Sequence, residues 1–368
     1  MSTGAGGGEG AWVLGVDSGG SGLRVALARW RPGEEGPPRP VGTASCPEPV
    51  RTGPAGIDAA HMAGQLVPAV RGLLAGASGG PGEARIAAAC VGAAGMATLG
   101  DGLRAELPGV LAGEFGVRRV ALAADAVTAY AGALGERPGA VVAAGTGMIA
   151  MGTDLVSWRR ADGWGHLLGD CGSGAWIGRA GLEAAMRAFD GRTGGSAALR
   201  ARAEEMFGAP LSGLPGRLYP RTDRPAVLAA FAPEVARCAA DDAVAAGILR
   251  TAAEEIAASA AAVCPSGGAP PDDASPVSRE FADAQAHIAC TGGLFHLGEP
   301  LTGPLRAELA ARLPRARLVE AAGGPLDGAL LLAGRLAGGG LALPSDPVLL
   351  SVSQTFAGGS RGARSPHR

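Results

Sequence analysis

The sequence predicts an α/β protein built from two similar domains. Its 368 residues are enough for two domains with a substantial buried core. Hydrophobic residues make up 47% of the chain and charged residues 18%, which is typical of a folded protein. Strand-like segments that form a hairpin come first and then alternate with helix-like segments, and this order starts twice, near residues 12–46 and 140–160. The repeated order of elements, rather than any direct sequence repeat, indicates two similar halves.

The individual elements follow from hydrophobic patterns. The apolar run WVLGVD at 12–17 and the alternating segment LRVALARW at 23–30 predict two strands, and the SGGSG between them predicts a tight turn. The same criteria predict further strands at 85–91, 117–124, 140–144, 148–153, 287–291 and 317–319. They predict helices within 56–74, near 103–115, at 126–134, from the end of the stretch 163–178 to about 189, over most of 197–264, at 301–313 and at 326–336.

The ends of the chain predict disorder. Gly, Ser and Pro are frequent in 1–10 and in 342–368, and PSGGAPPDDASPVS at 265–278 predicts a loop or insertion. The N-terminus has neither the positive charge nor the apolar run of a signal peptide, and the uncharged stretches are too short to span a membrane. The 6 cysteines are scattered and lack zinc-site spacing, so we expect reduced thiols in a cytoplasmic protein.

The charges exclude several function classes. Acidic and basic residues number 34 and 32 and are well mixed, so the sequence favours neither a nucleic acid nor a membrane surface as partner. Every basic residue is Arg, and the absence of Lys excludes both a P-loop and the protein-kinase mechanism, which require one. A phosphoryl-transfer enzyme of this composition must neutralise phosphate charge with Mg²⁺, backbone N–H groups and Arg.

Three glycine turns follow predicted strands. They contain Gly19, Gly20 and Ser21 in the first, Gly145, Thr146 and Gly147 in the second, and Gly292 and Gly293 in the third. Such turns let backbone N–H groups approach an oxyanion, because no Cβ intervenes. Each turn by itself could be no more than a hairpin connection. Three of them together, two with a hydroxyl, favour a phosphate-binding role.

Three acids stand beside these turns or at strand–helix junctions. Asp17 precedes the first turn, where a carboxylate next to phosphate would be repelled unless it held Mg²⁺ through water. Asp125 lies at a strand–helix junction, and Asp170 lies among the glycines of GWGHLLGDCGSG. The alternative for Asp17 is a turn cap, and for Asp125 and Asp170 it is a helix N-cap.

The ordered motifs carry a family resemblance. VDSGGSG, AADA, AAGTG, GWGHLLGDCGSG, CTGG and GGPLDGALLLA, in this order, resemble the actin/hexokinase/Hsp70-type ATPase superfamily. Within it, the chain resembles the N-acetylglucosamine kinase family, which shares its domain with BadF/BcrA-type ATPases, over about residues 12–338. The resemblance implies two domains of the actin-like, ribonuclease H-like fold, at 11–122 and 123–325, with an interdomain cleft. It also implies that a C-terminal helix near 326–340 packs back on the first domain.

The resemblance implies an ATP-dependent amino-sugar kinase that uses Mg²⁺. The implied roles are phosphate binding by Gly19, Gly20, Ser21, Gly145, Thr146 and Gly147, adenosine contacts by Thr291, Gly292 and Gly293, and Mg²⁺ binding through water by Asp17. Asp125 would be the catalytic base and would contact the sugar together with Trp164, Gly165 and Asp170. A homodimer is compatible with this family.

The chain departs from the family pattern at three places. Cys171 replaces a Glu, Met148 and Ile149 replace polar residues of the second turn, and 46–56 lacks an Asn. Those polar groups help to recognise the sugar, so N-acetylglucosamine, glucosamine and other amino sugars stay open.

The alternatives to a kinase are a redox activator and a sugar sensor. An ATPase activator of a redox enzyme would place paired cysteines at an iron–sulfur cluster, and scattered cysteines argue against it. A non-catalytic sugar sensor would carry a DNA-binding domain, for which the ten residues before the first strand leave no room.

Overall fold

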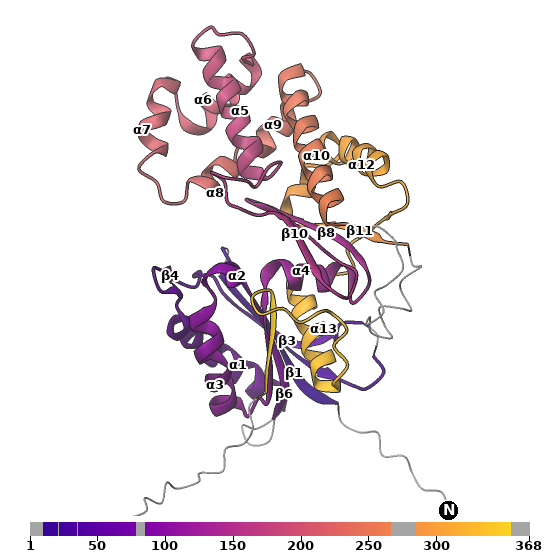
Figure 1. Ribbon diagram of the computed structural model, residues 1–368. Coiled ribbons are helices and arrows are strands. Elements are labelled where there is room, and N and C mark those ends of the chain that lie inside the picture. The colour runs from indigo at the N-terminus through magenta and orange to yellow at the C-terminus, as the bar shows by residue number, and fades with distance from the viewer. Residues whose placement is uncertain (1–9, 21, 35, 79–84, 266–284, 355–368) are drawn as a thin grey trace, which may run out of the picture. The chain divides into compact units, whose positions relative to one another are not determined.

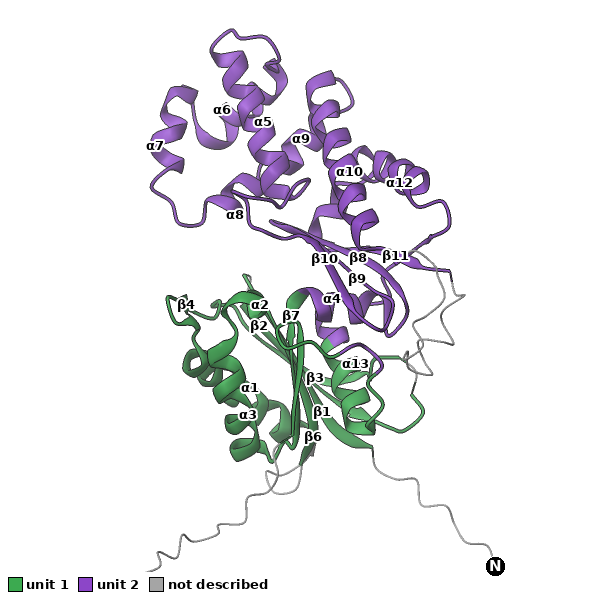
Figure 2. Cartoon of the chain, in the orientation of Figure 1, with its two compact units in different colours: residues 1–125, 329–341, 345–368 green, residues 126–328, 342–344 purple. Residues whose placement is uncertain are grey.

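The computed structural model describes residues 10–20, 22–34, 36–78, 85–265 and 285–354. The chain divides into two compact units, one of residues 1–125, 329–341 and 345–368, the other of residues 126–328 and 342–344 (Figure 2). Each unit combines a sheet with helices, so the predicted α/β class is confirmed. The boundaries predicted at 122/123 and 325/326 each fall three residues before the division at 125/126 and 328/329.

The first unit has a six-stranded sheet in the order β13-β7-β6-β1-β2-β3 (Figure 1). β1, β2 and β3 form an antiparallel meander, while β6 is parallel to β1 and β7 is parallel to β6. The strands are β1 (Ala11–Gly19), β2 (Gly22–Trp30), β3 (Pro40–Cys46), β6 (Ile86–Ala93), β7 (Arg119–Ala124) and β13 (Leu350–Gln354), beside the short pair β4 (Thr52–Gly53) and β5 (Gly56–Ile57).

The second unit repeats this order with five strands, β10-β9-β8-β11-β12. β8, β9 and β10 form the meander, and β11 and β12 follow in parallel. The two sheets therefore share one topology, which confirms the two similar halves predicted from element order. The strands are β8 (Gly139–Ala144), β9 (Met148–Thr153), β10 (Trp158–Asp162), β11 (His287–Thr291) and β12 (Arg317–Val319).

Helices cover both sheets. The first unit contains α1 (Ala59–Ser78), α2 (Met96–Leu99) and α3 (Asp101–Phe115). The second contains α4 (Asp125–Leu134, from Ala126 on), α5 (Gly174–Phe189), α6 (Ala197–Phe207), α7 (Leu214–Leu218), α8 (Arg224–Ala229), α9 (Ala232–Cys238), α10 (Ala243–Val263) and α12 (Glu299–Arg312), with 3₁₀ turns η1 (Leu211–Gly213) and η2 (Gly293–Leu297). Within the described residues, we find no helix that combines the length and the apolar character needed to cross a membrane.

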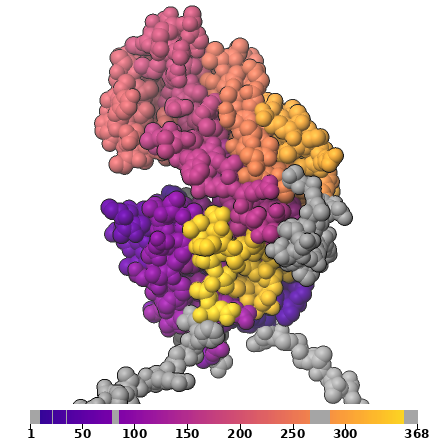
Figure 3. Space-filling model, viewed as in Figure 1, coloured from indigo at the N-terminus to yellow at the C-terminus, as the bar shows by residue number. Residues whose placement is uncertain are grey.

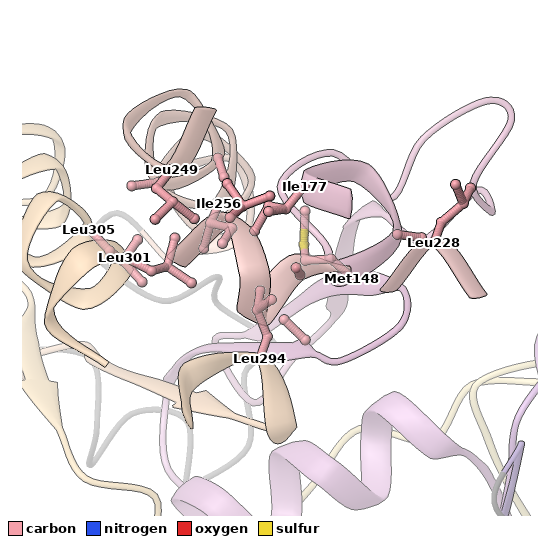
Figure 4. Packing of buried hydrophobic residues seen from close by; sticks show 14 of the residues in the cluster. Met148, Ile177, Leu228, Leu249, Ile256, Leu294, Leu301 and Leu305 are labelled. Carbon is pink, nitrogen blue, oxygen red and sulfur yellow. The ribbon is translucent and has the colours of Figure 1, made fainter. Parts of the chain in front are cut away.

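The second unit has a continuous apolar core. Met148 of β9, Ile177 of α5 and Ile256 of α10 are buried together, and α12 adds Leu301 and Leu305 (Figure 4). The second turn of the sequence therefore continues into a core residue at Met148 rather than into a polar, ligand-facing one.

The C-terminal helix α13 (Pro325–Gly338) crosses the division of the chain, and its residues from Ala329 onward belong to the first unit. Leu330 lies against Gly15 of β1, at a distance that excludes a Cβ there. Gly334 and Gly338 lie against the Trp30 ring. Small residues on α13 thus let the helix lie directly on the first sheet.

The expected disorder from residue 342 is wrong as far as Gln354. β13 pairs with the outer edge of β7, and Asp346 begins this segment by accepting the N–H groups of Val348 and Leu349, both at 2.8 Å. The alternation from Leu350 onward buries Leu350 while exposing its neighbours in part. In Figure 3 the yellow C-terminal residues lie against the purple ones of the same unit. An edge with unpaired backbone groups binds even this polar strand.

The other two predicted flexible segments lie mostly outside the described residues. Of 1–10, only Gly10 is described, and it is buried with its carbonyl accepting Arg29 Nη1 at 2.9 Å, which corrects the prediction for that residue. Of 265–278, only the first residue is described.

Candidate functional site

The first unit brings two acids to one edge of its sheet. The parallel strands β1, β6 and β7 end there, and Asp17 is in register with Gly92, which is in register with Ala123. Neighbouring strands lie about 4.8 Å apart, so Asp17 and Ala123 are separated by about 10 Å. Asp125 follows two residues later as the first residue of α4. The base and the cation ligand expected from the sequence therefore belong to the same sheet edge.

The turn after Asp17 is a two-residue hairpin connection. Gly19 pairs with Gly22, which leaves Gly20 and Ser21 between the strands, and Ser21 lies outside the described residues. Gly22 has a φ of +116°, and a Cβ there would lie 2.2 Å from the Cys46 carbonyl oxygen. At Gly19 and Gly20 a Cβ would meet nothing within 4 Å. Gly22 is thus required by the fold, whereas the other two leave open space beside the backbone.

Asp17 is buried and forms an ion pair across the hairpin. Its Oδ2 accepts Arg24 Nε at 3.0 Å and also accepts Arg24 Nη2. The two residues are opposite each other in the register of β1 and β2. Sequence reasoning did not find this pair. The charge of Asp17 therefore has a structural partner in the same unit.

Asp125 begins α4 at the end of β7. Its side chain is half-buried, and all residues from Ala126 to Leu134 are buried behind it. The first turn of a helix carries partial positive charge, which stabilises a carboxylate. Asp125 is therefore attached to a helix whose remaining residues are all buried.

In the second unit, the turn Gly145–Gly147 packs on the start of α5. The Gly145 and Thr146 carbonyls accept the N–H groups of Gly174 and Ala175, at 2.9 and 3.0 Å. Ser173 caps the same helix by accepting the Trp176 N–H at 3.2 Å. The helix cap is therefore Ser173, and the N-cap alternative for Asp170 is wrong.

Asp170 lies directly on this turn. Its Oδ1 accepts the Gly165 N–H at 3.1 Å, and a Cβ at Gly147 would lie 2.7 Å from its Oδ2. Burial raises the pKa of the Asp170 carboxyl, and the nearby Asp162 adds to this, against the lowering effect of backbone N–H groups and His166. Asp170 also has a left-handed φ of +53°. The loop thus holds a carboxylate where its charge is disfavoured.

The third predicted turn lies at the same sheet edge of this unit. Thr291 at the end of β11 is in register with Ala143 of β8. Gly292 has a φ of +106°, and a Cβ there would lie 2.2 Å from the Ala144 carbonyl oxygen. Gly293 begins η2, and a Cβ there would meet nothing within 4 Å. The second and third turns are therefore neighbours, with Asp170 on the second.

Trp164 and Gly165 are exposed on the loop before Asp170. Trp164 is 62% exposed, and the ring contact described for it is the Arg160 guanidinium, 4.3 Å from the ring centroid. Gly165 has a φ of +83° with open space at its Cβ position. An exposed aromatic ring beside a carboxylate is suited to covering the apolar face of a sugar.

Two departures from the resemblance have structural explanations. Met148 is a core residue, and the Ile149 side chain lies against Gly163, where a Cβ would approach to 2.8 Å. The Cys171 thiol hydrogen-bonds to Asp162, and burial raises its pKa, so the thiol stays protonated. These positions support the loop.

Sequence reasoning missed Asp162 and Arg160, which surround this loop. Asp162 ends β10 with a φ of +60°, and its two carboxylate oxygens accept the Asp170 and Cys171 N–H groups. The dipeptide Asp162-Gly163 after a strand is a turn signal, and it could have identified Asp162 as a residue that shapes the loop.

The chain matches one family model over most of its length. Residues 14–333 match the BadF/BadG/BcrA/BcrD ATPase family. The chain belongs to this family.

Two solved structures resemble this protein in fold, and one further relative resembles it in sequence. A proposed N-acetylglucosamine kinase from Chromobacterium violaceum is 28% identical with a TM-score of 0.59, covering 89% of this chain and 99% of its own. A second protein so described, from Porphyromonas gingivalis, shares the fold at 18% identity and a TM-score of 0.59, covering 89% and 98%. The N-acetylmuramic acid/N-acetylglucosamine kinase of Clostridium acetobutylicum is 44% identical over 69 residues, which span 18% of this chain and only 22% of that relative.

The raised pKa of Asp170 predicts how the stability of the protein changes when this carboxylate is replaced by a neutral side chain. A carboxyl whose pKa is raised by folding contributes stability below its unfolded pKa and loses that contribution as the pH rises through the folded value. At neutral pH the ionised group therefore destabilises the fold. We expect Asp170→Asn to melt at the same or a higher temperature than the parent at about pH 7.5, with the difference shrinking toward about pH 5.

Thermal melts of both proteins across this pH range measure the effect. A variant that melts below the parent at neutral pH would show instead that the ionised carboxylate stabilises the loop.

Proposed function

We propose that this protein is an ATP-dependent kinase that transfers the γ-phosphoryl group to the primary hydroxyl of an amino sugar, N-acetylglucosamine or glucosamine. The observation that carries the proposal is the shared sheet edge of the first unit, where Asp125 follows the end of β7 and the open glycine turn follows Asp17 of β1, two strands away. A general base and a phosphate-binding turn then rest on one rigid support. The 28% identical relative described as an N-acetylglucosamine kinase supports the choice of acceptor.

The ATP side of the reaction uses the glycine turns. Gly19, Gly20 and Ser21 donate backbone N–H groups to phosphate oxygens, and residues 291–293 lie beside the adenosine. The turn Gly145–Gly147 contributes the N–H groups of Thr146 and Gly147, while its Gly145 N–H donates to the Gly147 carbonyl at 2.8 Å and shapes the turn. Mg²⁺ arrives with ATP as substrate and keeps several waters, so one carboxylate is enough to orient it. Asp17 fits this role because it is a buried carboxylate next to the turn. The Arg24 guanidinium, which pairs with Asp17, adds a positive charge beside Mg²⁺ to balance the phosphate charge.

The sugar side uses the loop of the second unit. The Asp170 carboxylate accepts hydrogen bonds from sugar hydroxyls, which offsets its partial burial. Trp164 covers an apolar face of the ring, and Gly165 allows close approach.

The chemical step needs one proton transfer. The Asp125 carboxylate accepts the proton of the sugar hydroxyl, and the hydroxyl oxygen forms a bond to the γ-phosphorus of ATP. The bond from that phosphorus to the bridging oxygen breaks, and ADP leaves with the electron pair. Positioning and charge stabilisation supply most of the rate.

The setting proposed is the cytoplasm, because all 6 cysteines are free thiols. Two of them, Cys90 and Cys264, are buried, whereas an iron–sulfur cluster shared at a subunit interface, as the redox-activator alternative requires, needs cysteines at the surface.

A panel of acceptors tests the function. With Mg²⁺-ATP, we expect ADP release to depend on N-acetylglucosamine or glucosamine, and to exceed the release with glucose or N-acetylmuramic acid. A coupled ADP assay measures the rates, and mass spectrometry locates the added phosphate. The same rate of ADP release with and without every sugar would overturn the proposed kinase.

Asp125→Asn tests the catalytic base. Removal of a general base typically costs about 10²–10⁴-fold in rate, so we expect kcat to fall by that factor while sugar affinity changes little. Asp101→Asn is the matched control, since Asp101 also begins a helix of the first unit and is exposed. If Asp125→Asn kept the kcat of the control, another group would have to accept the proton.

Asp17→Asn tests the cation ligand. Loss of the charge should raise the Mg²⁺ concentration needed for half-maximal activity and lower kcat. Arg24→Gln breaks the same ion pair but keeps the carboxylate, so its effect on the Mg²⁺ titration should be smaller. Equal shifts in the two variants would assign Asp17 to the hairpin instead of the cation.

A further inference from the structure

The Asp162 carboxylate holds the two ends of the loop from Gly163 to Gly169 together. Asp162 Oδ1 accepts the Asp170 N–H at 2.6 Å, and Oδ2 accepts the Cys171 N–H at 2.8 Å. The residue before the loop thereby holds the two residues after it. Hydrogen bonds to an ionised acceptor are about twice as strong as neutral ones, so this closure is firm. The orientation of the Asp170 backbone follows from it.

A single guanidinium holds the other side of the loop. Arg160 Nε donates to the Asp162 carbonyl at 3.1 Å, and Nη2 donates to the Gly163 carbonyl at 2.5 Å. The same guanidinium lies over the Trp164 ring. Arg160 therefore couples the backbone at the start of the loop to the plane of an indole that is otherwise largely in water.

Close packing at Gly169 restricts the conformation of the loop. A Cβ at Gly169 would lie 2.3 Å from Asp162 Oδ1 and 3.0 Å from the Trp164 Cβ. Asp162 has a left-handed φ of +60°, which is disfavoured for a residue other than glycine. A residue that adopts a disfavoured φ and places both carboxylate oxygens on backbone donors is held there by its contacts.

We propose that Asp162 and Arg160 are the positioning residues of the sugar site, Asp162 by fixing Asp170 and Arg160 by fixing the Trp164 ring. This inference rests on the proposed function, since Asp170 and Trp164 are its sugar contacts. Asp162 itself needs no contact with the sugar, because its oxygens are occupied by the loop backbone. Arg160 covers one face of the indole, and the sugar stacks on the other.

Two variants and one matched control test the proposal. Asp162→Asn retains one acceptor oxygen but places an NH₂ group toward the second N–H, and Arg160→Gln removes the guanidinium. Arg159→Gln is the control, because Arg159 is the neighbour of Arg160 on the same strand and is exposed. We expect the KM for the sugar to rise about 10- to 100-fold in the two variants, as for loss of a charged hydrogen bond. The KM for ATP should change less than about twofold, and Arg159→Gln should behave as the parent.

A double-mutant cycle separates positioning from general destabilisation. Because Asp162 acts through Asp170, Asp162→Asn should raise the sugar KM strongly in the parent and hardly at all in an Asp170→Ala background. The change of tryptophan emission on sugar binding should be lost in Arg160→Gln, as in Trp164→Phe, and kept in Arg159→Gln. Asp162→Asn and Arg160→Gln are two independent routes, so failure of one to fold leaves the other decisive.

The outcomes distinguish this inference from the proposed function. A parent that phosphorylates no sugar overturns both. An active parent whose folded variants keep the sugar KM within about twofold, or whose Asp162→Asn effect is undiminished without Asp170, overturns the positioning role alone.

Discussion

The second unit depends on backbone segments that approach one another too closely for any side chain to intervene. A Cβ at Gly147, Gly172, Gly174 or Gly292 would lie between 2.2 and 2.8 Å from its nearest neighbour, and three of these neighbours are carbonyl oxygens. The contacts join the turn after β8, the start of α5, the end of β11 and, through Gly172, the helix α10. They let the turn's own carbonyls satisfy the first N–H groups of α5, which a helix cannot satisfy internally. Gly145 has open space at its Cβ position within this close-packed frame, while its N–H donates to the Gly147 carbonyl and its own carbonyl accepts the Gly174 N–H.

Two neighbouring carboxylates in this frame have opposite environments. Asp162 places both oxygens on backbone N–H groups and so serves the loop. Asp170 also accepts backbone N–H groups, but it is partly buried and has a raised pKa that the charge of Asp162 raises further. An ionised carboxylate in this setting lowers the stability of the fold, and a ligand that donated further hydrogen bonds to it would offset that loss.

Much of the fold was predictable because its elements follow from the local sequence pattern. Both hairpins, and most of the strands and helices after them, follow from alternation and from glycine turns, and the repeated order predicted the common topology. β13 could not be predicted, because a short polar strand forms only where the edge of β7 offers partners. Asp162 was missed for a similar reason: its role depends on donors eight and nine residues away. Met148 looked like a lost polar contact, yet the core it fills is assembled from α5, α10 and α12, far along the chain.

The two units use one strand order but place their acids differently. In the first, Asp17 lies inside the hairpin strand β1, two residues before the closing pair Gly19–Gly22. The position two residues before the closing pair of the second hairpin, Ala144–Met148, is the buried Val142 of β8. The second unit therefore has no carboxylate at the hairpin itself, and its acid reaches the turn from the loop after β10, held there by Asp162. The shared topology determines where each turn lies, and the residues around it decide which carboxylate lies beside that turn.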